Sequence, residues 1–303
     1  MRILTVVLTV LGLCVFEAVS SVDNAIINAE VLSGMGARAR RWFLTWGMLF
    51  AVFVVRGLLP WLIVWVSIPG LGPIGALTAA FSSDPVVVAA VDSMAPVLLM
   101  GGGVFLVLLF LHWLFLEPKN FGFIGEKFFF AQGVWFYAIA SVFLAVIVWF
   151  SMHIGTLVAF AAVVGSTVFF ITHGFKGSAE AQETRLMSTG LSDMSRILYL
   201  EFIDMTFSID GVLGAFAFTL SVPLIVLGNG LGAVIVRQIT IGNIGRIKRF
   251  LYLKNGAMYS ILVLGIVMMC DGFGVSVPQW VSPVTTFAVV GFFFGKSLRN
   301  IRA

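Results

Sequence analysis

Two short acidic motifs stand within otherwise apolar stretches of this 303-residue chain. Residues 17–24 read EAVSSVDN, and residues 204–211 read DMTFSIDG. Both follow one pattern, in which an acid is followed four residues later by Ser and six residues later by Asp. Hard divalent cations such as Mg²⁺, Ca²⁺ and Mn²⁺ prefer oxygen ligands, and neither motif contains Cys or His. The motifs therefore indicate an all-oxygen cation site.

The side chains expected to form this site come from both motifs. The expected metal ligands are Glu17, Asp23, Asn24, Asp204, Ser208 and Asp210. A second group is expected to surround them, namely Ser21, Asn28, Arg56, Glu201, Arg237 and His112. For Arg56 and Arg237 a structural ion pair or a helix-end anchor is an equal alternative. Glu201 is equally expected to line the same cavity or to snorkel or support the ligands from outside. For His112 an anchoring role at the membrane interface is favoured over a proton relay. No catalytic residue is predicted.

The spacing within each motif constrains the helix that carries it. Glu17 and Ser21 are four residues apart and share a helix face, as do their counterparts in the second motif. Glu17 and Asp23 are six apart, which is about 240° around an ideal helix. Both cannot face one ion unless the helix unwinds locally. The spacing therefore predicts helix breaks near residues 20–25 and 207–212.

The composition places these acids in a membrane protein. The chain is 60% hydrophobic and 11% charged, whereas soluble domains average about 45–50% apolar and about 25% charged residues. The net charge of +4 is attributed to membrane topology, and no nucleic-acid partner is expected. A charged side chain at the bilayer centre costs at least about 2.5–3.5 kcal/mol. The motif carboxylates must therefore face the protein interior, pair, or bind a cation.

Hydropathy predicts an all-α polytopic membrane protein with nine transmembrane helices in a single domain over 1–303. The predicted spans are 3–31, 42–66, 96–116, 129–150, 154–173, 197–220, 223–241, 255–272 and 283–297. The N-terminal stretch resembles a secretory signal peptide, but apolar sequence resumes directly after the first motif. We therefore interpret this stretch as the first span.

The basic residues predict the orientation of these spans. Fifteen of the 18 Lys and Arg residues lie after spans 1, 3, 5 and 7 or in the C-terminal tail. Cytoplasmic loops collect basic residues. The N-terminus is therefore expected outside and the C-terminus in the cytoplasm, with the protein in the cytoplasmic (inner) membrane.

In this orientation the two motifs run in opposite directions, because span 1 enters the cytoplasm and span 6 leaves it. Opposed copies of one motif predict an inverted-topology repeat of three plus three helices. The first repeat is 1–116 and the second is 197–272, with 129–173 inserted and 283–297 appended. Transporters with such repeats place the substrate site at the midplane between them. The glycine-rich LGNGLG at 227–232 is attributed to close helix packing.

With these motifs the chain resembles the TerC family of integral membrane proteins, within the LysE-like transporter superfamily. The resemblance is carried by Glu17, Ser21, Asp23 and Asn24 in the first motif and by Asp204, Phe207, Ser208 and Asp210 in the second. Gly211 stands where the family usually has Ser. The segments GNGLGAVIVRQITI and LYLKNGAMYSILVLG are also similar to the family's spans 7 and 8. The resemblance implies metal-ion efflux, with Mn²⁺ the leading substrate.

The sequence therefore favours a secondary transporter that exports a divalent cation by alternating access. The chain is not expected to be an enzyme or to hold a prosthetic group, and its expected partners are a divalent metal ion and the lipid bilayer. One alternative is an exporter of a small organic cation or amino acid. Others are an intramembrane enzyme that uses Asp23 and Asp210 as an acid–base pair, and a cation channel or scaffold without coupled transport.

Overall fold

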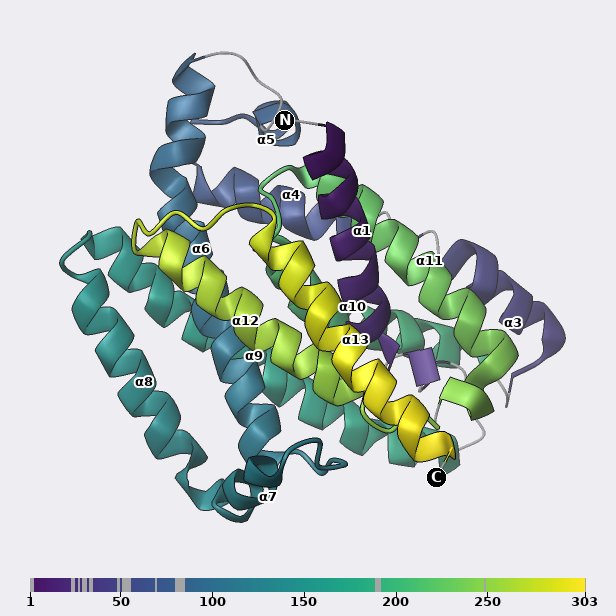
Figure 1. Ribbon diagram of the computed structural model, residues 1–303. Helices are drawn as coiled ribbons and strands as arrows, with labels where there is room; N and C mark the ends of the chain where they lie inside the picture. The colour runs from purple at the N-terminus through teal and green to yellow at the C-terminus, as the bar shows by residue number, and fades with distance from the viewer. Residues whose placement is uncertain are drawn as a thin grey trace.

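The structure, a computed structural model, is built of helices throughout the part of the chain that it describes (Figure 1). That part comprises residues 3–22, 25–26, 28, 32, 35–47, 50, 56–68, 70–79, 85–188, 192–247 and 249–302. The elements are α1 (Ile3–Ser20), α3 (Ala37–Trp42), the π-helical turn η1 (Phe43–Gly47), α4 (Arg56–Ser67), α5 (Pro73–Thr78), α6 (Pro85–Leu116), α7 (Ile124–Ala131), the 3-10 turn η4 (Gly133–Trp135), α8 (Phe136–Ser151), α9 (Thr156–Ser188), α10 (Asp193–Ala215), α11 (Val222–Ile247), α12 (Leu253–Gly272) and α13 (Val281–Arg302). The predicted all-α class is confirmed.

Six helices within the described residues are long and apolar enough to cross a membrane. They are Ile3–Ser20, Ala89–Leu116, Gly133–Ser151, Thr156–Phe175, Leu253–Gly272 and Val281–Ile301. In α8 the large apolar side chains of Val142, Trp149 and Phe150 are exposed, as expected of a helix that faces lipid. These features support the prediction of a polytopic membrane protein.

The remaining three predicted spans lie in less regular or less apolar helices. Predicted span 42–66 is divided between η1 and α4, and the apolar part of α4, Gly57–Val66, is shorter than a bilayer crossing. The apolar part of α11, Val222–Val236, is also short. The count of nine transmembrane helices therefore stays a prediction.

Helices α6 and α12 form the centre of the bundle and run antiparallel. Met100 of α6 lies beside Gly272 of α12, and Gly103 lies beside Gly265. The two glycines approach reciprocally: a methyl group on Gly103 would lie 2.9 Å from the Gly265 carbonyl oxygen, and one on Gly265 would lie 3.1 Å from that of Gly103. Small residues at this crossing let the two backbones meet, which is how helices commonly pack in membranes.

Helices α9 and α13 cover this central pair, α9 against α6 and α13 against α12. Helix α1 packs against α11, α13 and α12, and lies beside α11 and α13 in Figure 1. The start of α1 and the end of α13 lie at opposite ends of the bundle in the same view. Helix α1, which carries the first acidic motif, is therefore enclosed by neighbours along much of its length.

The contact between α6 and α9 gives a first prediction. A methyl group on Gly165 of α9 would overlap the carbonyl oxygen of Gly101 in α6, and backbone cannot rotate away as a side chain can. We expect Gly165→Ala to destabilise the purified protein by about 1–3 kcal/mol, the usual cost of overpacking. Thermal unfolding in detergent measures the effect.

The matched control is Gly291→Ala in α13. No atom lies within 4 Å of a methyl group at Gly291, and Ala is favoured over Gly within a helix by about 1 kcal/mol. This variant should be as stable as the wild type or more so. Equal melting temperatures for Gly165→Ala and Gly291→Ala would contradict the close α6–α9 approach.

Candidate cation site

Glu17 of the first motif is a buried carboxylate in the last turn of α1. Its side chain is 1% exposed. The hydroxyl of Ser21 donates a hydrogen bond of 2.6 Å to Oε1 of Glu17, so the two residues share a helix face as their spacing predicts. Burying a carboxylate inside a membrane protein is costly unless charge or hydrogen bonds compensate for it. Glu17 is therefore the strongest described candidate for a cation ligand.

The second motif meets Glu17 directly. A methyl group on Gly211 of α10 would lie 2.6 Å from Oε2 of Glu17, so the carboxylate rests against the bare backbone of that glycine. One turn further along, Gly214 lies against the ring of Phe16. The structure thus brings together two motifs that are far apart in sequence. Glycine at 211, where the TerC resemblance would place Ser, leaves room for the carboxylate.

Helix α11 closes the other side of Glu17. A methyl group on Gly232 would lie 2.6 Å from the carbonyl oxygen of Cys14 and 2.7 Å from Cβ of Glu17. Gly228, one turn earlier, packs against Leu13. The glycines of LGNGLG therefore permit close helix packing, as predicted, and they do so around the candidate site.

Asn229 is a site residue that the sequence reasoning missed. Its side chain is fully buried, and its Nδ2 donates a long hydrogen bond of 3.4 Å to the carbonyl oxygen of Gly211, the glycine that contacts Glu17. Its Oδ1 is buried and has no hydrogen-bond partner among the described residues. A buried amide oxygen without a hydrogen bond destabilises the folded protein. A ligand that accepts the oxygen's lone pair would remove this cost. Its only sequence signal was an amide within an otherwise apolar glycine-rich stretch.

Two further predicted ligands lie on the same part of α10. Ser208 is buried at 3% exposure, and Asp210 is partly buried, with its Oδ1 inaccessible to solvent. Both are within one helical turn of Gly211. The structure therefore brings Glu17, Ser21 and Asn229 to one contact between α1, α10 and α11, with Ser208 and Asp210 on the adjoining turn of α10.

The other expected ligands fall outside what the structure describes. Asp23 and Asn24 lie outside the described residues. Asp204, Arg56 and Arg237 belong to described helices, but their side chains are outside the description. Among the described side chains, no three His, Cys, Asp or Glu groups are gathered in a way that would hold a metal ion.

The remaining predicted neighbours occupy separate positions. Glu201 lies against Gly47 of η1, and ten residues of helix place it about 15 Å along α10 from Gly211. Asn28 is 6% exposed, and its Oδ1 has no hydrogen-bond partner among the described residues. His112 belongs to a different cluster, at the end of α6.

The predicted break near 207–212 is wrong, because α10 is one continuous helix over Asp193–Ala215. The glycines in this stretch, Gly211 and Gly214, pack closely against Glu17 and Phe16. At the first motif α1 ends at Ser20, yet helical hydrogen bonds continue from the Ser21 amide to the Glu17 carbonyl and from the Ala25 amide to the Ser21 carbonyl. The centre of the break predicted at 20–25 lies outside the described residues.

Comparison with protein families matches residues 22–303 to the family described as "Protein of unknown function (DUF475)". The match covers most of the chain, including the second motif and the end of the first. The chain belongs to the DUF475 family. No curated protein and no solved structure matches the chain.

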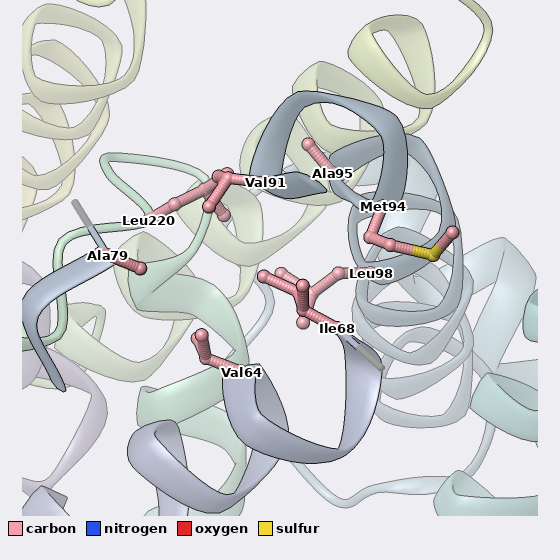
Figure 2. A pocket seen from close by; sticks show the side chains of 8 residues that line it. All are labelled: Val64, Ile68, Ala79, Val91, Met94, Ala95, Leu98 and Leu220. Carbon is pink, nitrogen blue, oxygen red and sulfur yellow. The ribbon is translucent and has the colours of Figure 1, made fainter. Parts of the chain in front are cut away.

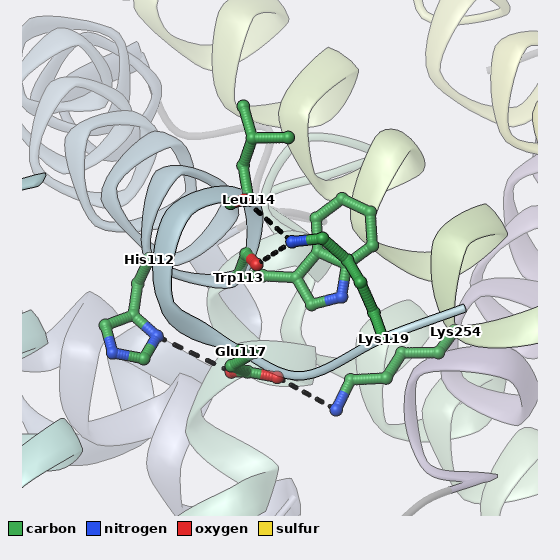
Figure 3. Close-up of polar contacts among 6 residues, drawn as sticks. All are labelled: His112, Trp113, Leu114, Glu117, Lys119 and Lys254. Atoms are coloured by element: carbon green, nitrogen blue, oxygen red, sulfur yellow. Dashed lines mark hydrogen bonds and ion pairs between the residues drawn. The ribbon is translucent and has the colours of Figure 1, made fainter. Parts of the chain in front are cut away.

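The DUF475 protein carries a second polar cluster at the end of α6 (Figure 3). Glu117 lies 2.9 Å from Nζ of Lys254 and 3.5 Å from Nδ1 of His112. Burial by itself would raise the pKa of Glu117, but the hydrogen bond with His112 and the positive charge of Lys254 outweigh it and hold this pKa below its usual range. The cluster ties the end of α6 to the start of α12. The His112 ring also lies against the His173 ring of α9, with ring centroids 3.6 Å apart and the ring planes tilted by 57°, a contact that the sequence did not suggest.

Lys119 is the other cation of this cluster. Its Nζ donates to the carbonyl oxygens of Trp113 and Leu114 and lies 4.3 Å from the centre of the Trp113 ring. Burial lowers the pKa of Lys119 from 10.5 to about 8, against the opposing charges of Glu126 and Glu117. The folded protein therefore holds this proton less tightly than the unfolded chain does.

This pKa predicts pH-dependent behaviour of the DUF475 protein. Between about pH 8 and 10.5 the unfolded chain binds more protons at Lys119 than the folded protein does. The contribution of Lys119 to the free energy of unfolding therefore rises with pH across that window. Acylation of Lys119 by a small amine-reactive ester, followed by mass spectrometry, should show a midpoint near pH 8. The exposed Lys127 of α7 serves as the comparison. Identical profiles for the two lysines would contradict the prediction.

Proposed function

We propose that this DUF475 protein is a secondary transporter that exports a divalent cation, with Mn²⁺ the leading candidate. The observation that carries the proposal is the contact between Glu17 of the first acidic motif and Gly211 of the second. Two motifs that share an acid, a Ser four residues later and an Asp six residues later meet at a buried carboxylate between three helices. Buried carboxylates, hydroxyls and amides are a ligand set for a hard cation.

The charge of the site supports a cation rather than an anion as substrate. The two motifs carry four acids, Glu17, Asp23, Asp204 and Asp210, and the described acids Glu17 and Asp210 lie on facing helices. Mutual repulsion of such groups is relieved when a cation binds among them. Asn229 would add a neutral oxygen ligand through its Oδ1.

The packing of the helices supports the inverted repeat that such a transporter needs. If α1, α4 and α6 correspond to α10, α11 and α12, the packing of α1 on α11 corresponds to that of α10 on α4. In the same way, the contact of α1 with α12 corresponds to the contact of α10 with α6. The reciprocal contact between Gly103 and Gly265 would then lie on the axis that relates the two halves. A pseudo-two-fold relation between two repeats produces this pattern of neighbours.

The two ends of the bundle differ in a way that suits alternating access. At the predicted outer end a small apolar cavity of about 20 Å³ is enclosed by side chains from α4, α6 and the α10–α11 loop (Figure 2). Its lining residues are Val64, Ile68, Ala79, Val91, Met94, Ala95, Leu98 and Leu220. At the predicted cytoplasmic end a cavity of about 370 Å³ reaches Val22 and Ile26, just beyond the Glu17 site.

The resemblance to the TerC family supports the same substrate class, and the distribution of Lys and Arg supports an orientation with the N-terminus outside and the C-terminus in the cytoplasm. The sequence carries no phosphate-binding ATPase motif, so we propose that an ion gradient drives transport. Protons exchanging on the same carboxylates would provide such coupling.

Uptake of radiolabelled Mn²⁺ into inverted membrane vesicles tests the proposal. Vesicles that contain the protein should accumulate Mn²⁺ in response to an imposed pH gradient, and vesicles without it should not. Unlabelled Mn²⁺ should compete, whereas lysine and other organic cations should not. Competition by an organic cation would favour the alternative substrate class, and equal uptake with and without the protein would overturn the proposal.

A further inference from the structure

The segment 124–135, which precedes α8, turns large apolar side chains outward. It consists of the short helix α7 and the turn η4. Its exposed large apolar residues, called the α7 apolar face below, are Ile124, Phe128, Phe129, Phe130, Val134 and Trp135. Ile124 and Val134 are 96% and 93% exposed, so neither end of this face is covered by the rest of the protein.

The acid of this segment points inward instead. Glu126 is 1% exposed and accepts hydrogen bonds from the amide of Gly122, from Nδ2 of Asn255 and from the hydroxyl of Tyr259. Asn255 and Tyr259 belong to α12, so this carboxylate fastens α7 to one of the two central helices. The polarity of α7 is therefore reversed, with a carboxylate toward the protein and phenylalanines toward the surroundings.

This reversed polarity indicates what surrounds the segment. A helix on a water-exposed surface usually turns its charged groups outward and its large apolar side chains inward. A contiguous apolar patch that a protein leaves exposed marks contact with another protein or with a membrane. The α7 apolar face therefore meets an apolar medium rather than water.

The neighbouring helix identifies that medium as lipid. Turn η4 leads directly into α8, and Gly133–Ser151 together form one of the six helices long and apolar enough to cross a membrane. The exposed side chains of Val134 and Trp135 are followed along the chain by those of Tyr137 and Val142 in α8. The α7 apolar face thus adjoins the part of the protein that faces lipid.

The length and residue types of the segment place it at the edge of the bilayer. Helix α7 has eight residues, far fewer than the roughly 20 that a bilayer crossing needs. Trp and Tyr are enriched where lipid headgroups meet acyl chains, and a Lys such as the exposed Lys127 can reach water from there. In Figure 1 α7 lies at the same end of the bundle as the end of α13, opposite the start of α1.

We propose that α7 and η4 form an interfacial element that inserts the α7 apolar face into one leaflet of the bilayer. In the predicted orientation this is the cytoplasmic leaflet. The face contacts the boundary between headgroups and acyl chains, as amphipathic interfacial helices do, while Glu126 holds α7 against α12. This contact does not depend on which substrate the Glu17 site carries.

Spin labelling of the full-length protein in vesicles of phosphatidylcholine and phosphatidylglycerol tests the proposal. Cys14 and Cys270 are replaced by Ala, and a nitroxide is attached to Phe128→Cys or to Val134→Cys. Collisions of the label are measured with O₂, which concentrates in lipid, and with a neutral nickel chelate, which stays in water. At both positions collisions with O₂ should exceed those with the chelate. The control is Arg38→Cys, at an exposed position in the arginine-rich helix α3, where the chelate should dominate.

Two results would overturn the proposal. Collisions dominated by the nickel chelate at Phe128→Cys and Val134→Cys, as at Arg38→Cys, would place α7 in water. Low collision rates with both reagents would mean that protein covers the face, and dipolar broadening between labels would identify that protein as a second copy of this chain. Size-exclusion chromatography and thermal unfolding establish that each labelled variant is folded, and the two positions report independently of each other.

Discussion

Replacing Glu17 with Gln is expected to reduce Mn²⁺ uptake into inverted vesicles by at least about 10- to 100-fold, the range seen when groups that support a metal site are lost. Gln has nearly the same shape as Glu, so the contacts with Gly211 and Gly232 survive, and the Ser21 hydroxyl still finds an amide oxygen. What disappears is the negative charge of a carboxylate that is only 1% exposed. The protein should fold and reach the membrane while its transport fails.

The control is Asp92→Asn, the same change from carboxylate to amide at an exposed position near the start of α6. It should transport at the wild-type rate. If Glu17→Gln transports as well as Asp92→Asn does, Glu17 is not a ligand of the transported cation. Thermal unfolding of both variants separates loss of transport from loss of folding.

Replacing Gly211 with Ala is expected to separate transport from stability. The new methyl group would lie 2.6 Å from Oε2 of Glu17, so the carboxylate must move. This movement costs little free energy, because the carboxylate is the end of a flexible side chain. In addition, Ala is favoured over Gly within a helix by about 1 kcal/mol. We expect a melting temperature close to that of the wild type, with Mn²⁺ uptake reduced roughly tenfold or more through a displaced ligand.

Gly232→Ala is the informative comparison, because it acts on the same glutamate from the other side. There the methyl group would lie 2.6 Å from the carbonyl oxygen of Cys14, which is backbone and cannot move away. This variant should lose about 1–3 kcal/mol of stability, and uptake should fall with it. Wild-type uptake by a folded Gly211→Ala protein would show that the position of the Glu17 carboxylate does not matter for transport.

Local and compositional features of this protein were predictable because they depend on few residues. The apolar composition predicted a polytopic helical membrane protein, and spacing alone placed Ser21 on the same face as Glu17. The match between the two motifs predicted that they act together. The nine spans and all six expected cation ligands, Glu17, Asp23, Asn24, Asp204, Ser208 and Asp210, stay predictions.

Other features depended on how helices pack, which a local pattern does not encode. The six-residue spacing suggested that α10 unwinds, but its glycines are used for contact with α1, and the helix continues. Asn229 was invisible as a site residue because its importance comes from burial beside Gly211, which is 18 residues away in sequence. The contact between the rings of His112 and His173 likewise joins two helices, α6 and α9, through packing.

The sequence by itself determined the chemistry available to this protein: acids, amides and hydroxyls in membrane helices, in two matching motifs. Only the tertiary structure decided which of these groups meet. Glu17 reaches Gly211 because glycines in α10 and α11 let three backbones approach closely, and this approach depends on how α1 packs against α10 and α11. The cavity of about 370 Å³ has the same origin, since its walls come from three segments that only helix packing brings together.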